Sequence, residues 1–188
     1  MSPDTIQHPV LGTLARRGSV FVGEVEAPAL DIFKYDTSYP NAPGPNGKYD
    51  VVIALEGDAA VPSQAALDLA AGLLSDPKQL AEQLADAMWD DVTGAGPDSG
   101  MWWHDNLNTV ANYLEEDGFT RPANAAELAQ HLRLSSIYFD QMFEASWIAL
   151  LSFWCRFEEE HDLGVAMNRE RVIGIGYGGG DLTLFDKV

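Results

Sequence analysis

The segment ASWIALLSFWCRF at residues 145–157 consists almost entirely of apolar side chains. From residue 149 onward, Leu150, Leu151, Phe153 and Trp154 leave scarcely a polar break. A short apolar run of this kind is typical of a strand that is buried on both faces of a sheet. We therefore expect residues 149–157 to form a central strand, and the rest of the chain to be organised around it.

Further short segments rich in β-branched and aromatic residues lie towards both ends of the chain. Glycine and proline separate the N-terminal ones, which favours an antiparallel meander, and residues 168–170 read as a hairpin turn. Prolines and glycines at residues 38–48 predict a loop. The expected strands are residues 10–14, 19–25, 29–35, 49–55, 134–139, 163–167 and 171–177.

The middle of the chain changes to a helical period. In its clearest helix, Asp76 is a good N-cap, Pro77 occupies the first turn and Gly94 is placed to end the helix. Leu80, Leu84, Met88 and Val92 form its apolar stripe. Other helices are expected from residue 62 to 74, from 101 to 114 and from 124 to 132.

Strands, then helices, then strands predict an α+β fold. We expect an antiparallel sheet of N- and C-terminal strands packed with a central group of helices. The chain has 188 residues, 46% of them hydrophobic, which suits one core. Residues 1–188 are therefore expected to form a single α+β domain.

The chain is strongly acidic, with 29 acidic against 11 basic residues and a formal charge of −18. Residues 49–120 hold 14 acidic residues and one basic residue, Lys78, and so carry −13 of this charge. Such a charge repels phosphate backbones and anionic lipids, so neither direct nucleic-acid binding nor membrane binding is expected. The excess indicates either a solubilising surface or a basic protein partner.

The best candidate for a partner-binding surface is the helix that begins at Pro77. Glu82, Asp86 and Asp90 recur at i, i+4 and i+8, which places three carboxylates on one helix face, and Asp91 adjoins them. Like charges at this spacing cost a few tenths of a kcal/mol each. The arrangement is either accidental or suited to lysine and arginine side chains of a partner.

Two other segments combine histidine with carboxylates. In Glu158-Glu159-Glu160-His161-Asp162, a strand sends alternate side chains to opposite faces, so a solvated hairpin end is favoured over a metal or catalytic site. We expect Glu160 and His161 to be structural there, with His161 bonded to backbone groups of the hairpin. In Trp102-Trp103-His104-Asp105, adjacent helical residues diverge, so His104 and Asp105 are not expected to act as a pair.

The sequence contains no motif for a cofactor or a closed metal site. Walker A, dinucleotide and nucleophile-elbow motifs are absent, and Gly174–Gly180 does not open a helix. The single cysteine, Cys155, excludes an intramolecular disulfide, and a Cys-based zinc cage would need cysteines from another chain. No cofactor and no metal are therefore expected. The absence of a signal-peptide pattern and the single cysteine, which fits a reducing compartment, favour a cytoplasmic location.

The C-terminal segments at residues 155–165, 171–176 and 180–183 resemble a family of uncharacterised bacterial domains. Those domains carry an aromatic-rich strand, an E-H-G-L turn, a hairpin and a tail ending in L-T; here Glu160-His161-Asp162-Leu163-Gly164 supplies the turn, with Asp162 in place of its glycine. Residues 11–14 are similar to the opening of the family. The resemblance implies a class that includes toxin-immunity proteins, and no catalytic residue.

Three functions remain open at this point. The leading interpretation is an acidic, cytosolic protein-binding module, such as an immunity protein that neutralises a basic toxin. The alternatives are an enzyme that uses the cluster at residues 158–162, and a structural or self-associating protein. The absent catalytic motifs make an enzyme the less favoured interpretation.

Overall fold

A computed structural model describes residues 4–35, 46–142, 146–178 and 182–185. Within these residues the chain has nine strands, four α-helices and one 3₁₀ helix, so the α+β class is confirmed. The sheet dominates the fold, since all nine of these described strands belong to one sheet and only four α-helices accompany it. In chain order the elements are β1 (Thr5–His8), β2 (Gly12–Arg17), β3 (Val20–Glu26), η1 (Pro28–Ile32), β4 (Lys48–Ala54), α1 (Gln64–Leu74), α2 (Pro77–Thr93), α3 (Leu107–Glu116), α4 (Ala125–Ala129), β5 (Leu132–Met142), β6 (Ser146–Cys155), β7 (Glu158–Met167), β8 (Val172–Tyr177) and β9 (Leu182–Leu184).

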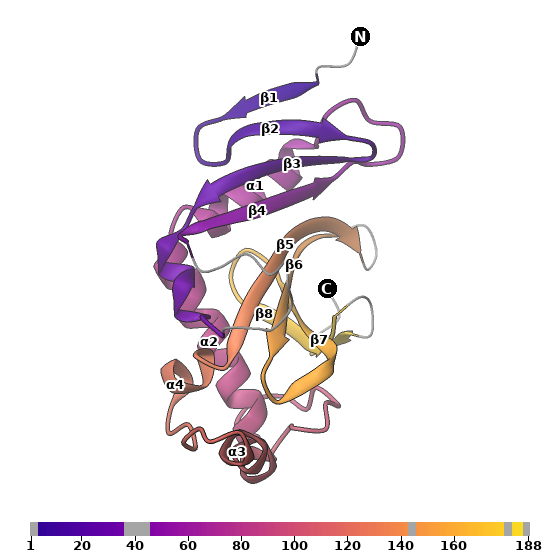
Figure 1. Ribbon diagram of the computed structural model, residues 1–188. Helices are drawn as coiled ribbons and strands as arrows, with labels where there is room; N and C mark the ends of the chain where they lie inside the picture. The colour runs from indigo at the N-terminus through magenta and orange to yellow at the C-terminus, as the bar shows by residue number, and fades with distance from the viewer. Residues whose placement is uncertain (1–3, 36–45, 143–145, 179–181, 186–188) are drawn as a thin grey trace.

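The nine strands form one sheet in simple chain order, from β1 to β9. Neighbouring strands are antiparallel except for β4 and β5, which run parallel with Val51 opposite Ile137. A parallel pair needs a long crossover, and all four α-helices lie in this connection. The sheet is strongly twisted, so that β1–β4 and β5–β8 separate into two parts in Figure 1.

The helix boundaries follow the local signals in the sequence. The side chain of Ser63 accepts a hydrogen bond from the Ala66 amide at the start of α1. Asp76 does the same for the Gln79 amide at the start of α2, directly before Pro77. Gly94 ends α2 with φ of 70°, a conformation that glycine adopts without strain. The predicted start and end of α2 are therefore confirmed.

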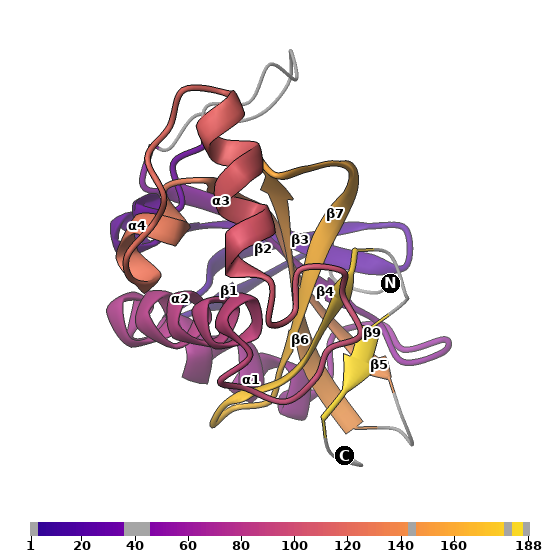
Figure 2. The same ribbon diagram turned by 90° about the horizontal axis from the view of Figure 1, so that it is seen from below.

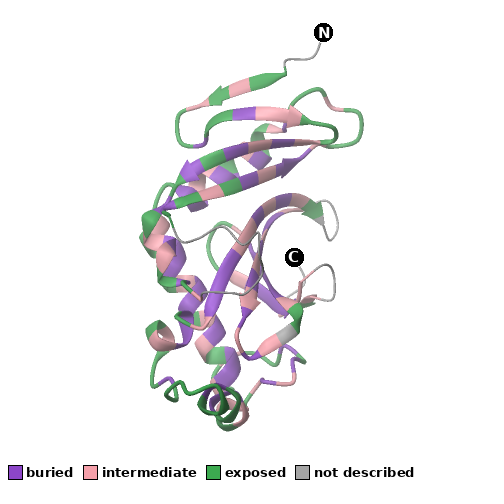
Figure 3. Ribbon diagram, in the orientation of Figure 1, coloured by how far each residue is buried: buried purple, intermediate pink, exposed green. Residues whose placement is uncertain are grey.

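The core lies between the helices and one face of the sheet. The predicted stripe of Leu80, Leu84, Met88 and Val92 is buried there. Figure 3 shows buried residues along the sides of α1 and α2 that face the sheet. A smaller cluster of Ile148, Ala166 and Ile173 lies on the other face, where Leu182 and Leu184 cover it. The central strand β6 therefore contacts apolar side chains on both faces, although Ser152 and Trp154 are only partly buried.

Three sequence predictions about elements are wrong. Residues 28–32 form the 3₁₀ helix η1 rather than a strand, because the carboxylate of Asp31 accepts hydrogen bonds from the Gly47 amide and the Tyr49 hydroxyl. The predicted helix at residue 101 begins only at Leu107. The strand predicted to reach residue 157 ends at Cys155, and a turn at residues 156–157 connects β6 to β7.

The segment before α3 is held by the end of α2 instead of forming a helix. The amides of Asp105 and Asn106 donate to the carbonyl oxygens of Asp91 and Val92. Asp105 has φ of 52°, which interrupts helical geometry. These contacts bring residues 102–105, which we call the tryptophan-rich segment, beside α2. None of the helices described here is long and apolar enough to span a membrane.

Candidate functional site

Three carboxylates of α2 face solvent in one row. Glu82, Asp86 and Asp90 are all exposed, as their spacing predicted. Lys78 lies 3.6 Å from the Oε1 atom of Glu82, but both side chains are largely exposed. An exposed ion pair of this kind contributes about 0–1 kcal/mol, so it neutralises the row only weakly. We call these three residues the α2 acidic face.

Asp91 does not belong to this surface, which corrects the sequence analysis. Its side chain is 2% exposed and accepts a hydrogen bond from the indole Nε1 of Trp103 at 2.8 Å. Its other oxygen lies 2.9 Å from Nδ1 of His104. One step along the helix from Asp90 turns the side chain by about 100°, towards the loop that precedes α3. Asp91 is therefore a structural carboxylate that ties this loop to α2.

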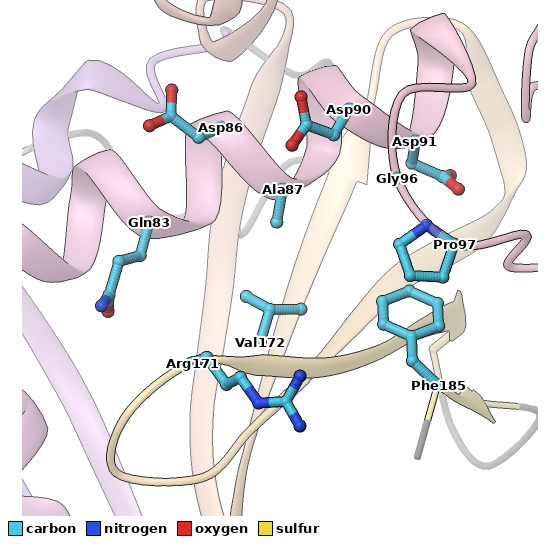
Figure 4. A pocket seen from close by; sticks show the side chains of 10 residues that line it. All are labelled: Gln83, Asp86, Ala87, Asp90, Asp91, Gly96, Pro97, Arg171, Val172 and Phe185. Atoms are coloured by element: carbon cyan, nitrogen blue, oxygen red, sulfur yellow. The ribbon is translucent and has the colours of Figure 1, made fainter.

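A pocket of about 440 Å³ opens beside the α2 acidic face. Asp86 and Asp90 lie on the α2 side of it, and Arg171 lies across from them at the start of β8 (Figure 4). Between these charged groups the lining is mainly apolar, with contributions from Ala87, Pro97, Val172 and Phe185. The pocket therefore combines anionic groups with an apolar floor, which suits a long side chain with a charged end.

In the tryptophan-rich segment, the histidine pairs with a carboxylate of α2 and not with the aspartate next to it in the sequence. His104 contacts Asp91 and not its neighbour Asp105, which is exposed. A carboxylate that orients an imidazole is an arrangement used in general base catalysis. Here the same carboxylate also binds Trp103, which is buried. Each of these contacts fixes residues 103–104 against α2, which accounts for the pair without a reaction.

Of the carboxylates at residues 158–162, the structure describes the side chains of Glu158, Glu160 and Asp162, at the start of β7. Oε1 of Glu158 accepts hydrogen bonds from the amides of Glu160 and His161, each at 3.2 Å. His161 has 56% of its side chain exposed and packs against the ring of Tyr177. Glu160 is exposed, and burial raises the pKa of Asp162. Among the described residues, no group of three or more His, Cys, Asp and Glu is arranged to hold a metal ion.

In the described residues, the side chain that bonds to backbone amides of this hairpin is Glu158, whereas the backbone bonds were expected from the ring of His161. Glu160 and His161 donate through their backbone amides, and the acceptor of both hydrogen bonds is the side chain of Glu158. The ring of His161 lies 3.4 Å from the same carboxylate at its exposed edge. Glu158 itself is 11% exposed.

The tryptophan-rich segment and the start of β7 are in contact, which the sequence did not predict. The indole Nε1 of Trp102 donates to Oε2 of Glu158 at 2.8 Å, across 56 positions of the chain. The tryptophan-rich segment is thus fixed on one side by Asp91 and on the other by Glu158. A tryptophan in a protein usually finds a partner for its indole N–H, and this general expectation was the available signal. It does not say which carboxylate the partner is.

The only cysteine of the chain, Cys155, is buried at the end of β6. Burial, together with the nearby carboxylates of Glu158 and Asp162, raises its pKa well above the ordinary value. The thiol is therefore held in its neutral form, which is poorly nucleophilic.

The fold and these contacts define an α+β domain in which the helical crossover between β4 and β5 carries the α2 acidic face. The chain belongs to the family described as a domain of unknown function (DUF6985), whose model matches residues 26–182. This match begins at the end of β3 and includes all four helices. No curated protein and no solved structure shows significant similarity to the chain.

Proposed function

We propose that this protein is an acidic protein-binding module that docks a basic partner on the α2 acidic face. The observation that carries the proposal is the row of Glu82, Asp86 and Asp90, all exposed and weakly compensated by Lys78. The row lies within residues 49–120, which carry a charge of −13. A field of this sign and size accelerates the encounter with a cationic surface.

The pocket beside the α2 acidic face can supply affinity, which the charge of this face alone does not provide. Carboxylates at a surface give association rate and orientation, whereas affinity depends on buried side chains that fill a pocket. A lysine or arginine of the partner can place its apolar stem against Ala87, Val172 and Phe185 while its charged end meets Asp86 or Asp90. The proposed complex therefore forms quickly, depends on salt and is anchored by one or a few basic side chains.

The kind of partner that we propose is a toxin, with this protein as its cytoplasmic immunity protein. The resemblance of the C-terminal segments to domains that include immunity proteins supports this assignment. So does the charge, since carboxylates in a row can occupy the place of nucleic-acid phosphates on a basic nuclease. A protein that blocks its target in this way needs no catalytic group of its own.

The test compares two triple variants of equal charge. E82Q/D86N/D90N neutralises the α2 acidic face, and D50N/D58N/E115Q removes three exposed carboxylates elsewhere. The probe is a basic protein encoded by a neighbouring gene, purified in an inactive form. We expect the first variant to associate more slowly and with a flatter salt dependence than the wild-type protein, measured at two ionic strengths. The second is expected to behave as the wild type.

Equal association rates for the two variants would remove the α2 acidic face from the proposal. Failure of the wild-type protein to bind any basic neighbour, together with self-association in sedimentation, would favour the structural interpretation instead.

A further inference from the structure

A second pocket, of about 510 Å³, lies where the end of α3 meets the turn between β6 and β7. These two elements lie side by side in Figure 2. The pocket shares no lining residue with the one beside α2. Its volume lies within the range of about 300–1,000 Å³ that is usual for small-molecule sites.

Aromatic rings form one part of this pocket. Trp102 and Tyr113 meet edge to face with their ring centroids 5.5 Å apart, and Phe157 also lines the pocket. Tyr113 is 53% exposed, so its ring is accessible to a ligand in this pocket. The face of an aromatic ring attracts cations, with tryptophan the strongest of the three.

Four carboxylates line the same pocket: Glu116 and Asp117 at the end of α3, and Glu158 and Glu160 at the start of β7. Glu158 is fixed in place, because Trp102 binds one oxygen and two backbone amides bind the other. Oε2 has one such donor and therefore keeps capacity for a second hydrogen bond. A carboxylate fixed before the ligand arrives loses little entropy on binding.

The described lining holds one cation, Arg156, which can compensate only one of these four negative charges. Its guanidinium carbon lies 4.4 Å from the ring centroid of Tyr35 and 4.0 Å from that of Phe119. It is thus held between two rings that lie outside the pocket lining. Four carboxylates against one guanidinium leave a net charge of −3. An anionic ligand would be repelled here.

From this lining we propose that the pocket binds an organic cation, namely a guanidinium or primary ammonium group on an alkyl chain. The charged end binds Glu158 and Glu160, and the alkyl chain lies against Trp102 and Tyr113. This site is independent of the α2 acidic face, since no residue is common to both. The cation is either a free small molecule or an arginine or lysine side chain of another protein.

The experiment titrates agmatine into the full-length protein and follows the indole N–H signals by NMR. N-butylurea, which is uncharged, and glutarate, which is anionic, serve as ligand controls. A second arm uses the capped tripeptide Gly-Arg-Gly, with Gly-Gln-Gly as its control. We expect agmatine or the arginine peptide to bind saturably and to shift the Trp102 signal, and the control ligands to leave it unchanged.

The variant E116Q/D117N/E160Q keeps Glu158 and the tryptophan contacts intact, and all three residues are exposed, so the fold is preserved. It is expected to weaken binding by about tenfold, because neutral amides no longer attract the cation. D50N/D58N/E115Q is the control of equal charge, and its affinity should stay within about twofold of the wild type. Tyr113→Ala should weaken binding as well, through loss of the ring.

Stronger binding of agmatine indicates a free metabolite as the ligand, and stronger binding of the arginine peptide indicates a side chain of a partner. Lack of saturable binding by both would overturn the proposal. So would an equal loss of affinity in the two triple variants, because the effect would then reflect overall charge and not the pocket.

Discussion

Replacing Asp91 by alanine is expected to destabilise the protein strongly. The carboxylate is buried, and it is the hydrogen-bond acceptor for the indole of Trp103 and the partner of His104. The substitution leaves the indole N–H of a buried tryptophan without its acceptor. An unsatisfied buried donor costs about 1–3 kcal/mol, and a hydrogen bond to a charged group contributes about 1.5–3 kcal/mol.

These contributions overlap, so we expect a loss of about 3 kcal/mol in the free energy of unfolding. That is a large part of the roughly 5–15 kcal/mol by which a domain is usually stable, although it leaves the variant folded at 25 °C. In a chain of this size each kcal/mol lowers Tm by about 2–4 °C, which gives a decrease of about 6–12 °C. Urea denaturation at pH 7, followed by circular dichroism, measures the free energy.

The neighbouring residue supplies the control. Asp90 is exposed on the same turn of α2, and Asp90→Ala should change the stability by no more than about 0.5 kcal/mol. Asp91→Asn keeps one oxygen for the indole and should fall between the two. In a double-mutant cycle with Trp103→Phe, the loss caused by Asp91→Ala should shrink, because the donor is already gone. A stability of D91A within about 0.5 kcal/mol of that of D90A would refute this reasoning.

Three further predictions concern other groups. Glu158→Ala should lower the free energy of unfolding by about 2–3 kcal/mol in urea denaturation, because the carboxylate accepts hydrogen bonds from Trp102 and from backbone amides. His161→Ala should lower it by less than about 0.5 kcal/mol. A larger loss in His161→Ala than in Glu158→Ala would show that the histidine orders the hairpin. Burial, and then the charge of Arg156, lower the pKa of His131 below its ordinary value of 6.5. As the pH falls, His131 is therefore protonated in the unfolded chain at a higher pH than in the folded protein. The free energy of unfolding should decrease as the pH drops below about 6.5. His131→Gln should flatten this fall between pH 7 and 5.5, and an unchanged slope would contradict it. Cys155 should react with a thiol reagent only as fast as the protein unfolds, and rapid modification of the native protein would show that its burial is wrong.

The sequence predicted the boundaries of α2 well, because the hydrogen bonds of a helix and its caps form between residues close together in the chain. The start and end of α2, its apolar stripe and the exposure of Glu82, Asp86 and Asp90 all follow from side-chain chemistry within a few residues. A helix pairs its backbone with itself, so its boundaries and faces depend on nearby residues. Four of the five strands after the helices, β5 to β8, were found for a similar reason, because a short run of apolar and β-branched residues is a local signal.

The same reasoning failed where the partner of a group is distant in the sequence. In the 3₁₀ helix at residues 28–32, Asp31 accepts hydrogen bonds from the Gly47 amide and the Tyr49 hydroxyl, and β9 pairs with β8. A short segment has no strong preference of its own, so its partner decides its structure.

The sequence by itself determined the α+β class, the acidic charge of the middle segment and the outward row of carboxylates on α2. Only the tertiary structure decided that Asp91 is buried while Asp90 is exposed, and that Trp102 meets Glu158. The row needs only the period of one helix, whereas a buried carboxylate needs donors from another segment to compensate its desolvation. Those donors lie 12 and 13 positions from Asp91, and 56 positions from Glu158, so the fold had to bring them together.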